Sequence, residues 1–273
     1  GVQTCALPIY EDALPKSNSH TRLSIDLLSA CPEFESRLRK YVRTLVIKGV
    51  PSTINSLQLL YKNEKKNKII EDLFLGMCNQ MEKDMTLSAE DEEEQDPTVQ
   101  LWLYYFVSQH YLLNSKPEEA LTYINKAIEH TPTVPDLFLH KAKIFYFLGN
   151  TVQAQKLVDE GRMLDTADRH INYTCTKYML RNNDIERAHD MMCLFSFEAL
   201  KGEGLNVHEM QTMWFEYEYA QAYYRRNEHR LALKQIGWMA GHLDTMQEDC
   251  IEFNNYGIRK GSLNHYLEMV DLQ

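Results

Sequence analysis

Four alanines recur along the chain at a nearly constant interval, and this repeat constrains the fold more than any other feature. Ala120, Ala154 and Ala188 are spaced by 34 residues, and Ala232 follows after a further 34 residues plus an insertion of ten. Small residues at such intervals let two antiparallel helices cross closely, while larger side chains fill the neighbouring grooves. Gly, Asn or Pro in "NSKP", "LGNT" and "RNND" mark points where one helix must end and another begin. The sequence therefore predicts successive pairs of antiparallel helices.

A 34-residue unit with this pattern resembles the tetratricopeptide repeat. Residues 99–246 hold four such units, each centred on one of the four alanines. Nowhere does the chain show a sustained alternation of apolar and polar residues of the kind that predicts β-strands. The resemblance implies an all-α fold, a right-handed superhelical solenoid of tetratricopeptide repeats.

The remaining segments are assigned by their spacing and composition. Residues 10–85 keep a helical spacing of apolar residues without the alanine frame, so we interpret them as degenerate helical repeats. The segment 86–98, "TLSAEDEEEQDPT", is acidic and aperiodic, and is predicted to be a solvated loop. The insertion near 199–210 is expected to form another exposed loop because it contains two glycines. Residues 247–273 are interpreted as the start of further solenoid helices, cut short.

Composition limits the classes of function. The chain has 39 acidic and 29 basic residues and a net charge of −10, which disfavours general binding to DNA or to anionic membranes. It contains no long apolar segment and no secretory signal, and its six cysteines form no C-x-x-C pair, so we expect a soluble, cytoplasmic protein with reduced cysteines. Residues 1–9, "GVQTCALPI", match a translated sequencing adapter and are left out of the fold argument. The chain is accordingly expected to be an internal fragment.

Catalytic motifs are missing from the sequence. It contains no G-x-x-x-x-G-K-[ST], G-x-S-x-G or H-E-x-x-H pattern, so no catalytic residue is predicted. His189 and Cys193 are four residues apart and could offer two metal ligands, but no further ligand pair accompanies them. We interpret them as parts of an ordinary helix face, and we predict no metal site. The acidic run 90–94 is likewise interpreted as solvated.

The repeat frame itself indicates which residues face a partner. In a tetratricopeptide array, positions 2, 5, 9 and 12 of the first helix of each pair line the concave face. Six of the aromatic residues at these positions are predicted to contact a partner protein: Trp102, Tyr105, Tyr146, Tyr173, Trp214 and Tyr217.

Cations gather at one position of this frame. Lys143 and Lys177 occupy the same position in successive repeats, and Lys141 and Arg169 lie one step away. Basic residues so placed in an acidic protein suggest a local anion site. The alternative is that these lysines extend into solvent or pair with Asp136 and Glu160.

Several stretches go beyond the generic repeat. "HTPTVPDLFLHKAKIFYFLGN", "LDTADR", "KYML" and "EMQTMWFEYEYAQAYYR" resemble the auxiliary subunit of the N-terminal acetyltransferase A complex, and the likeness extends from about Leu23 to the end of the chain. The resemblance implies a non-catalytic scaffold that wraps the catalytic subunit and anchors it to the ribosome for co-translational N-terminal acetylation. It also implies that the ribosome is contacted by other parts of a longer chain.

The same resemblance implies a ligand. Complexes of this family hold inositol hexakisphosphate in a basic pocket between the two subunits. The matching segments here, with Arg169 beside them, carry the candidate residues for that site: Lys141, Lys143, Arg169, Lys177 and Tyr178. No cofactor is expected for chemistry, so inositol hexakisphosphate would be a structural ligand.

Two other classes of function stay open. The first is a free-standing adaptor of the chaperone type, whose groove clamps the C-terminal carboxylate of a peptide with Lys and Asn. The corresponding positions here hold Tyr105, Gln109, Leu139 and Lys143, which fits that pattern poorly. The second is an unrecognised enzyme. An acetyl-CoA enzyme would need a Q/R-x-x-G-x-G/A loop, which the chain lacks.

Overall fold

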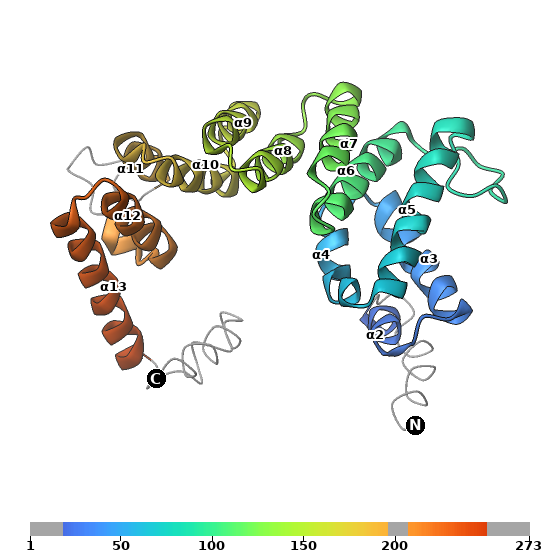
Figure 1. Ribbon diagram of the computed structural model, residues 1–273, viewed down its shortest axis with the longest axis horizontal. Helices are drawn as coiled ribbons and strands as arrows, with labels where there is room; N and C mark the ends of the chain where they lie inside the picture. The colour runs from blue at the N-terminus through green and yellow to red at the C-terminus, as the bar shows by residue number, and fades with distance from the viewer. Residues whose placement is uncertain (1–18, 196–206, 250–273) are drawn as a thin grey trace. The chain divides into compact units, whose positions relative to one another are not determined.

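The computed structural model describes residues 19–195 and 207–249, and every regular element in these ranges is a helix (Figure 1). The chain divides into two compact units, residues 1–165 and 166–273, which are described separately. The first unit contains α2 (Ser19–Leu27), α3 (Pro32–Ile47), α4 (Thr53–Leu57), the 3₁₀ helix η1 (Gln58–Lys62), α5 (Glu64–Asp84), α6 (Pro97–Leu113), α7 (Pro117–His130), α8 (Pro135–Phe147) and α9 (Thr151–Leu164). The second contains α10 (Arg169–Arg181), α11 (Ile185–Cys193), the 3₁₀ helix η3 (Val207–Met210), α12 (Met213–Arg225) and α13 (His229–Asp249).

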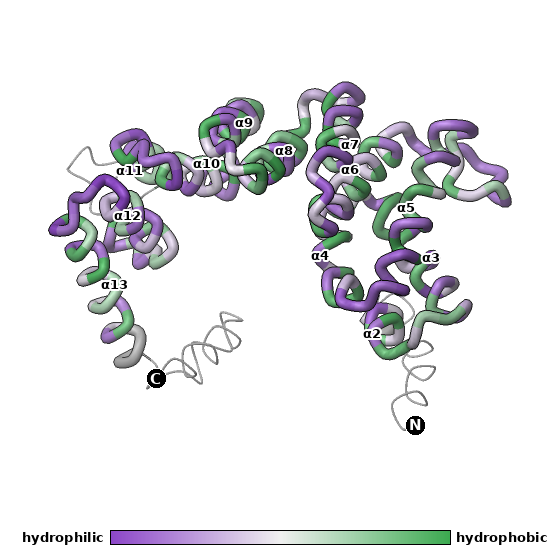
Figure 2. The backbone as a smooth tube through the Cα atoms, in the orientation of Figure 1, coloured by the Kyte–Doolittle hydropathy of each residue, from purple (hydrophilic) through white to green (hydrophobic). Residues whose placement is uncertain are grey.

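The four predicted repeats correspond to four helix pairs: α6 with α7, α8 with α9, α10 with α11, and α12 with α13. Ala120, Ala154 and Ala188 are completely buried, and Ala232 is 5% exposed. Close approach at the crossings is also evident at Gly161 of α9, where an added Cβ would lie 3.1 Å from the Cβ of Phe138 on α8. The small residues therefore mark helix crossings, and the prediction of an all-helical repeat fold is confirmed. Figure 2 shows the alternation of hydrophilic and hydrophobic residues along these helices.

The turn inside each pair contains one residue with a positive φ angle. These residues are Ser115, Gly149, Asn183 and Asn227, with φ angles of 58°, 82°, 61° and 61°. They are spaced by the same 34, 34 and 34 plus ten residues as the alanines. A left-handed residue directly after a helix ends it and redirects the chain. Only one of the four residues is glycine, so the recurrence of positive φ angles cannot be recognised from the residue types alone.

The acidic segment 86–98 is less solvated than its composition predicts. Its described backbone is irregular up to Asp96, which caps α6 by accepting a hydrogen bond from the backbone N–H of Thr98 at 2.8 Å. Leu87, however, is only 2% exposed and belongs to the core of the first unit. Asp91 pairs with Arg43 of α3 at 2.7 Å. The segment is therefore a loop, as predicted, but it is anchored at two points and is less solvated than expected.

The predicted exposed loop near 199–210 lies mostly outside the described residues. Its described part begins at η3, where Val207 is only 3% exposed, so this end of the insertion is packed within the second unit. Close by, the buried carboxylate of Glu216 on α12 has one oxygen 2.8 Å from a ring nitrogen of His208 and 2.8 Å from one of His242. This carboxylate thus joins η3, α12 and α13. The helices predicted for residues 247–273 lie outside the described residues beyond Asp249.

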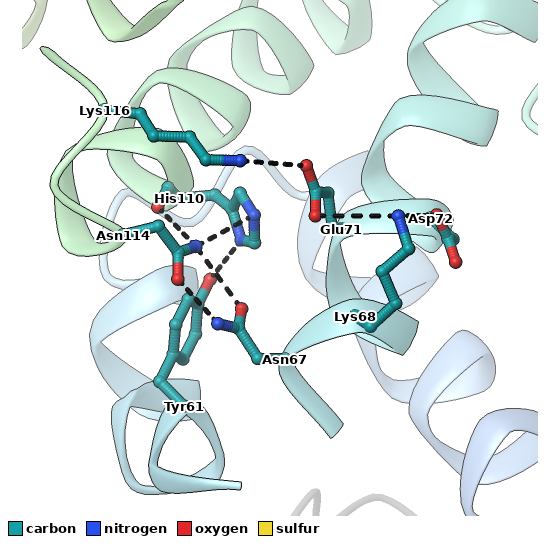
Figure 3. A network of polar contacts seen from close by, with 8 residues as sticks. All are labelled: Tyr61, Asn67, Lys68, Glu71, Asp72, His110, Asn114 and Lys116. Atoms are coloured by element: carbon teal, nitrogen blue, oxygen red, sulfur yellow. Dashed lines mark hydrogen bonds and ion pairs between the residues drawn. The ribbon is translucent and has the colours of Figure 1, made fainter. Parts of the chain in front are cut away.

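A polar network joins η1, α5 and α6 in the first unit (Figure 3). The Tyr61 hydroxyl lies 2.9 Å from Nδ1 of His110, and the Asn114 amide lies 3.0 Å from Nε2 of the same ring. Asn114 also exchanges hydrogen bonds with Asn67. Burial lowers the pKa of His110 to about 4, so the ring is neutral at pH 7. Ion pairs at the rim of the network involve Lys68, Glu71, Asp72 and Lys116.

Candidate functional site

The first two candidate anion ligands lie on α8 in the first unit. Lys143 is exposed and Lys141 is half-buried, and fully buried Ala142 separates them. Consecutive helical residues are rotated by about 100°, so side chains two positions apart leave the helix in nearly opposite directions. A small anion against α8 would therefore contact one of these lysines rather than both, and Lys143 is the more exposed. Within the described ranges neither lysine forms an ion pair, so the alternative pairing with Asp136 and Glu160 is not observed there.

The other candidate cations lie on α10 in the second unit. Arg169 is exposed at the first position of the helix, and its guanidinium carbon lies 5.9 Å from the centre of the Phe195 ring. The ammonium nitrogen of Lys177 lies 3.7 Å from Glu218 of α12, whose carboxylate also accepts a hydrogen bond from Arg181 at 2.9 Å. Lys177 thus has a charged partner that the sequence frame did not indicate. An anion bound by Lys177 has to compete with Glu218.

Two of the candidate residues are buried. Tyr178 is 7% exposed and lies beside the fully buried Met179 on α10. Tyr105 is 6% exposed, and its ring packs edge-on against that of His140 at a centroid distance of 5.4 Å. Burial raises the pKa of Tyr105, which is consistent with an enclosed hydroxyl. The expectations that Tyr178 contacts an anion and that Tyr105 contacts a partner are corrected accordingly, since both rings fill the interior of their units.

The remaining aromatic candidates differ in how much surface they offer. Trp102 is half-buried and covers the turn after α3, because a Cβ added to Gly49 would lie 2.3 Å from its Nε1 atom. Tyr173 of α10 and Trp214 of α12 lie side by side, with ring centroids 5.7 Å apart. Tyr146 and Tyr217 are 37% and 53% exposed. The ring of Tyr173, at position 5 of its first helix, therefore meets that of Trp214, at position 2 of the next first helix. Among these candidates Tyr217 offers the largest free aromatic surface.

The described residues offer few groups suited to chemistry. They include no group of three or more His, Cys, Asp or Glu side chains that could hold a metal ion. His189 and Cys193 do share a helix face, with Nδ1 and Sγ 3.8 Å apart. Burial raises the pKa of the Cys78 thiol to about 11, which keeps it protonated and unreactive. Among the described helices, none has the length and apolar character needed to cross a bilayer.

Comparison with known proteins gives a consistent family. The family described as "N-terminal acetyltransferase A, auxiliary subunit" matches residues 6–273. The human "N-alpha-acetyltransferase 16, NatA auxiliary subunit" is 36% identical over 98% of this chain and 31% of its own length. The Arabidopsis thaliana "N-terminal acetyltransferase A complex auxiliary subunit NAA15" is 34% identical over 94% of this chain and 28% of its own length. The chain thus spans about a third of the length of these curated relatives.

Solved structures agree with these relatives. A chain in the "Structure of Naa15/Naa10 bound to HypK-THB" superposes with a TM-score of 0.80 at 31% identity, covering 99% of this chain and 40% of that one. A chain in the "Crystal structure of Podosopora anserina putative kinesin light chain nearly identical TPR-like repeats" superposes with a TM-score of 0.52 at 13% identity, over 72% of this chain and 98% of that one. The second likeness concerns the fold alone, and it supports the tetratricopeptide-type repeat.

Proposed function

The chain belongs to the family of auxiliary subunits of the N-terminal acetyltransferase A complex, and from this we propose that it is a segment of a non-catalytic scaffold. The scaffold wraps and positions a catalytic acetyltransferase subunit and anchors it to the ribosome in the cytoplasm. The observation that carries the proposal is the family match across residues 6–273 on a fold of paired helices. The related solved structure pairs Naa15 with Naa10, which supports a partner of the catalytic type.

The repeat surface supports the same role. Paired helices present a long surface on which side chains recur at fixed positions, and exposed aromatic residues are frequent anchors of protein interfaces. Tyr217, 53% exposed, and Tyr146, 37% exposed, are the predicted groove residues with the most free surface. We assign the partner contact to these two residues first, and next to the half-buried Tyr173 and Trp214.

A pull-down tests this function. The tagged full chain is mixed with a catalytic subunit of the Naa10 type and, separately, with a C-terminal chaperone peptide. We expect the catalytic subunit to be retained and the chaperone peptide to be lost. Tyr217→Ala should reduce retention several-fold, while Leu59→Ala serves as the matched control because Leu59 is 65% exposed on η1, outside the predicted groove. Retention of the chaperone peptide alone would favour the adaptor instead.

The geometry weighs against that adaptor. A carboxylate clamp needs polar side chains that reach into the groove from fixed first-helix positions. Two of these positions hold Tyr105 and Leu139, which are 6% and 8% exposed and form part of the interior. Only Gln109 and Lys143 are left at the corresponding positions, and neither restores the Lys and Asn pattern.

We also propose inositol hexakisphosphate as a structural ligand, with a smaller set of residues than the sequence suggested. Lys143 of the first unit and Arg169 of the second are each exposed, so each can contact a phosphate group from its own unit. Lys177 can contribute only by leaving Glu218, and Lys141 projects from a different face of α8. Tyr178 is dropped from the set because it is buried.

A further inference from the structure

Helix α3 carries a concentration of positive charge that the proposed function does not use. Its sequence, "PEFESRLRKYVRTLVI", holds three arginines and one lysine against two glutamates, in a chain whose net charge is −10. Two hollows of about 260 and 350 Å³ lie along this helix, and both are lined by Ser36 and Lys40. The first hollow is also bounded by Met77 of α5 and by Leu87 of the acidic segment. These elements belong to the first unit (Figure 1).

The cations of α3 differ in their partners. Arg37 pairs with Glu33 at 3.1 Å and Arg39 with Glu35 at 3.2 Å, each within one turn of α3. Lys40 is exposed, and it forms no ion pair with any residue that the structure describes. Because it lines both hollows, Lys40 is the cation best placed to receive a carboxylate from outside.

The remaining cation of α3, Arg43, indicates which kind of ligand this surface binds. The Arg43 guanidinium hydrogen-bonds Asp91 of the acidic segment at 2.7 Å, and this bond lowers the pKa of Asp91. Leu87, 2% exposed, inserts into the core beside it. An acidic stretch with an apolar residue therefore already lies against α3, supplied by the chain itself. Lys40 lies one helical turn before Arg43 and is also a cation. Unlike Arg43, it binds no carboxylate from the described part of the chain.

We propose that the α3 hollow, bounded by Arg39, Lys40 and Arg43 over an apolar floor, binds an acidic peptide segment of a partner protein. The carboxylates of the peptide would meet Lys40 and Arg39, and its apolar side chains would contact the small apolar surface left at Met77 and Leu87. Asp91 competes for Arg43, so the acidic segment limits access. A peptide suits the site better than a nucleic acid, because a peptide can place uncharged residues beside Glu90 and Asp91 in the wall, whereas a nucleic acid would set its continuous row of phosphates against them.

Fluorescence anisotropy tests the site with the full chain and a labelled peptide of alternating glutamate and leucine residues. We expect saturable binding that weakens with added salt, since the charges are exposed. Lys40→Gln should weaken binding about three- to fivefold, as is typical of one exposed ion pair. The matched control is Lys65→Gln, which removes an exposed lysine from α5 and should leave the affinity unchanged. Asp91→Asn should strengthen binding by freeing Arg43.

Four results would overturn the proposal: no saturable binding, equal losses in Lys40→Gln and Lys65→Gln, no gain in Asp91→Asn, or binding of a short RNA in place of the peptide with the same dependence on Lys40. Circular dichroism of each variant checks that the helical fold of the chain is intact. The measurement needs no catalytic subunit, so its failure and the failure of the scaffold function are distinguishable.

Discussion

A single lysine can occupy a predicted ligand position and still be engaged elsewhere, as Lys177 shows. Its ammonium group lies 3.7 Å from Glu218, a carboxylate whose side chain is only 10% exposed and which also binds Arg181. Removing one partner from a buried charge is costly, because the other charge then lies unpaired. Lys143 has the equivalent repeat position but no such partner among the described residues. The two lysines should therefore respond differently to the same substitution.

The first prediction uses this difference. Lys143→Gln should weaken binding of inositol hexakisphosphate by roughly 1.5–3 kcal/mol, the usual contribution of a charged hydrogen bond. Lys177→Gln should weaken it less, because the wild-type lysine must first leave Glu218. Calorimetric titration in the presence of the catalytic subunit measures both losses. Lys156→Gln, which removes an exposed lysine from α9, is the control and should have no effect. If wild type and Lys143→Gln bound inositol hexakisphosphate with equal affinity, Lys143 would be an ordinary solvated residue and not a ligand of the anion.

The second prediction concerns buried histidines. Burial lowers the pKa of His110 from its ordinary value of 6.5 to about 4, and that of His140 to about 3. The unfolded chain binds protons at these sites below about pH 6.5 while the folded chain does not, so stability falls as the pH drops from about 6.5 toward 4. The loss is about 1.4 kcal/mol for each unit of pKa shift. Thermal melting across this range measures it.

The control for this pH dependence is His130→Asn, which removes an exposed histidine. It should leave the slope of melting temperature against pH unchanged, whereas His110→Gln should flatten it. A melting temperature that stays constant from pH 6.5 to 4.5 would contradict a neutral, buried His110 in the network of Figure 3.

At the scale of the helix pair, the turn rather than the crossing gives the sharpest test. Gly149 has a φ angle of 82° and nothing within 4 Å of an added Cβ, so a substitution there meets only backbone strain. Gly76 of α5 also has open space around an added Cβ, but its backbone is helical. The same substitution, glycine to alanine, at both positions therefore isolates the effect of backbone conformation on stability from the effect of side-chain packing.

The third prediction follows from this pair. Gly149→Ala should lower stability by about 1–2 kcal/mol, the cost of the left-handed conformation for an L-residue. Gly76→Ala should raise stability by about 0.5–1 kcal/mol, because alanine favours the helix interior. Urea denaturation of the two variants gives both values. Changes of the same sign in the two variants would mean that the turn of the second repeat is misplaced.

At the scale of the whole molecule, the chain consists of two compact units, each with its own buried residues. A scaffold that wraps another subunit gains stability from it, because any partner that binds only the folded state shifts the unfolding equilibrium. This provides a readout of the proposed function that does not depend on a particular contact residue.

The fourth prediction is that a catalytic subunit of the Naa10 type raises the melting temperature of the full chain. The gain should reach about 2.7 kcal/mol when the free partner is present at one hundred times its dissociation constant. Differential scanning calorimetry at increasing partner concentration measures the rise. An unrelated globular protein at the same concentration is the control, and an equal shift with it would show crowding instead of binding.

The sequence alone was sufficient for the helical repeat, because the signals that specify it are local. The spacing of alanines, the apolar periodicity and the turn residues are all contained within one 34-residue unit, and each of Ala120, Ala154 and Ala188 is completely buried as that spacing requires. The family resemblance was likewise readable from short motifs such as "LDTADR". The motifs "NSKP" and "RNND" located two of the turns, but the positive φ angles were not predicted, because Ser115, Asn183 and Asn227 are not glycines.

Only the tertiary structure decided which predicted surface residues are available. Tyr105 and Tyr178 fall at plausible positions of the repeat frame, yet neighbouring helices cover them. The partner of Lys177 lies on α12, and Arg43 pairs with Asp91 48 residues away, contacts that no local spacing encodes. Helical periodicity sets the direction in which a side chain leaves the axis of its own helix. Whether that direction ends in solvent, in another side chain or against a carboxylate depends on how helices distant in sequence pack together.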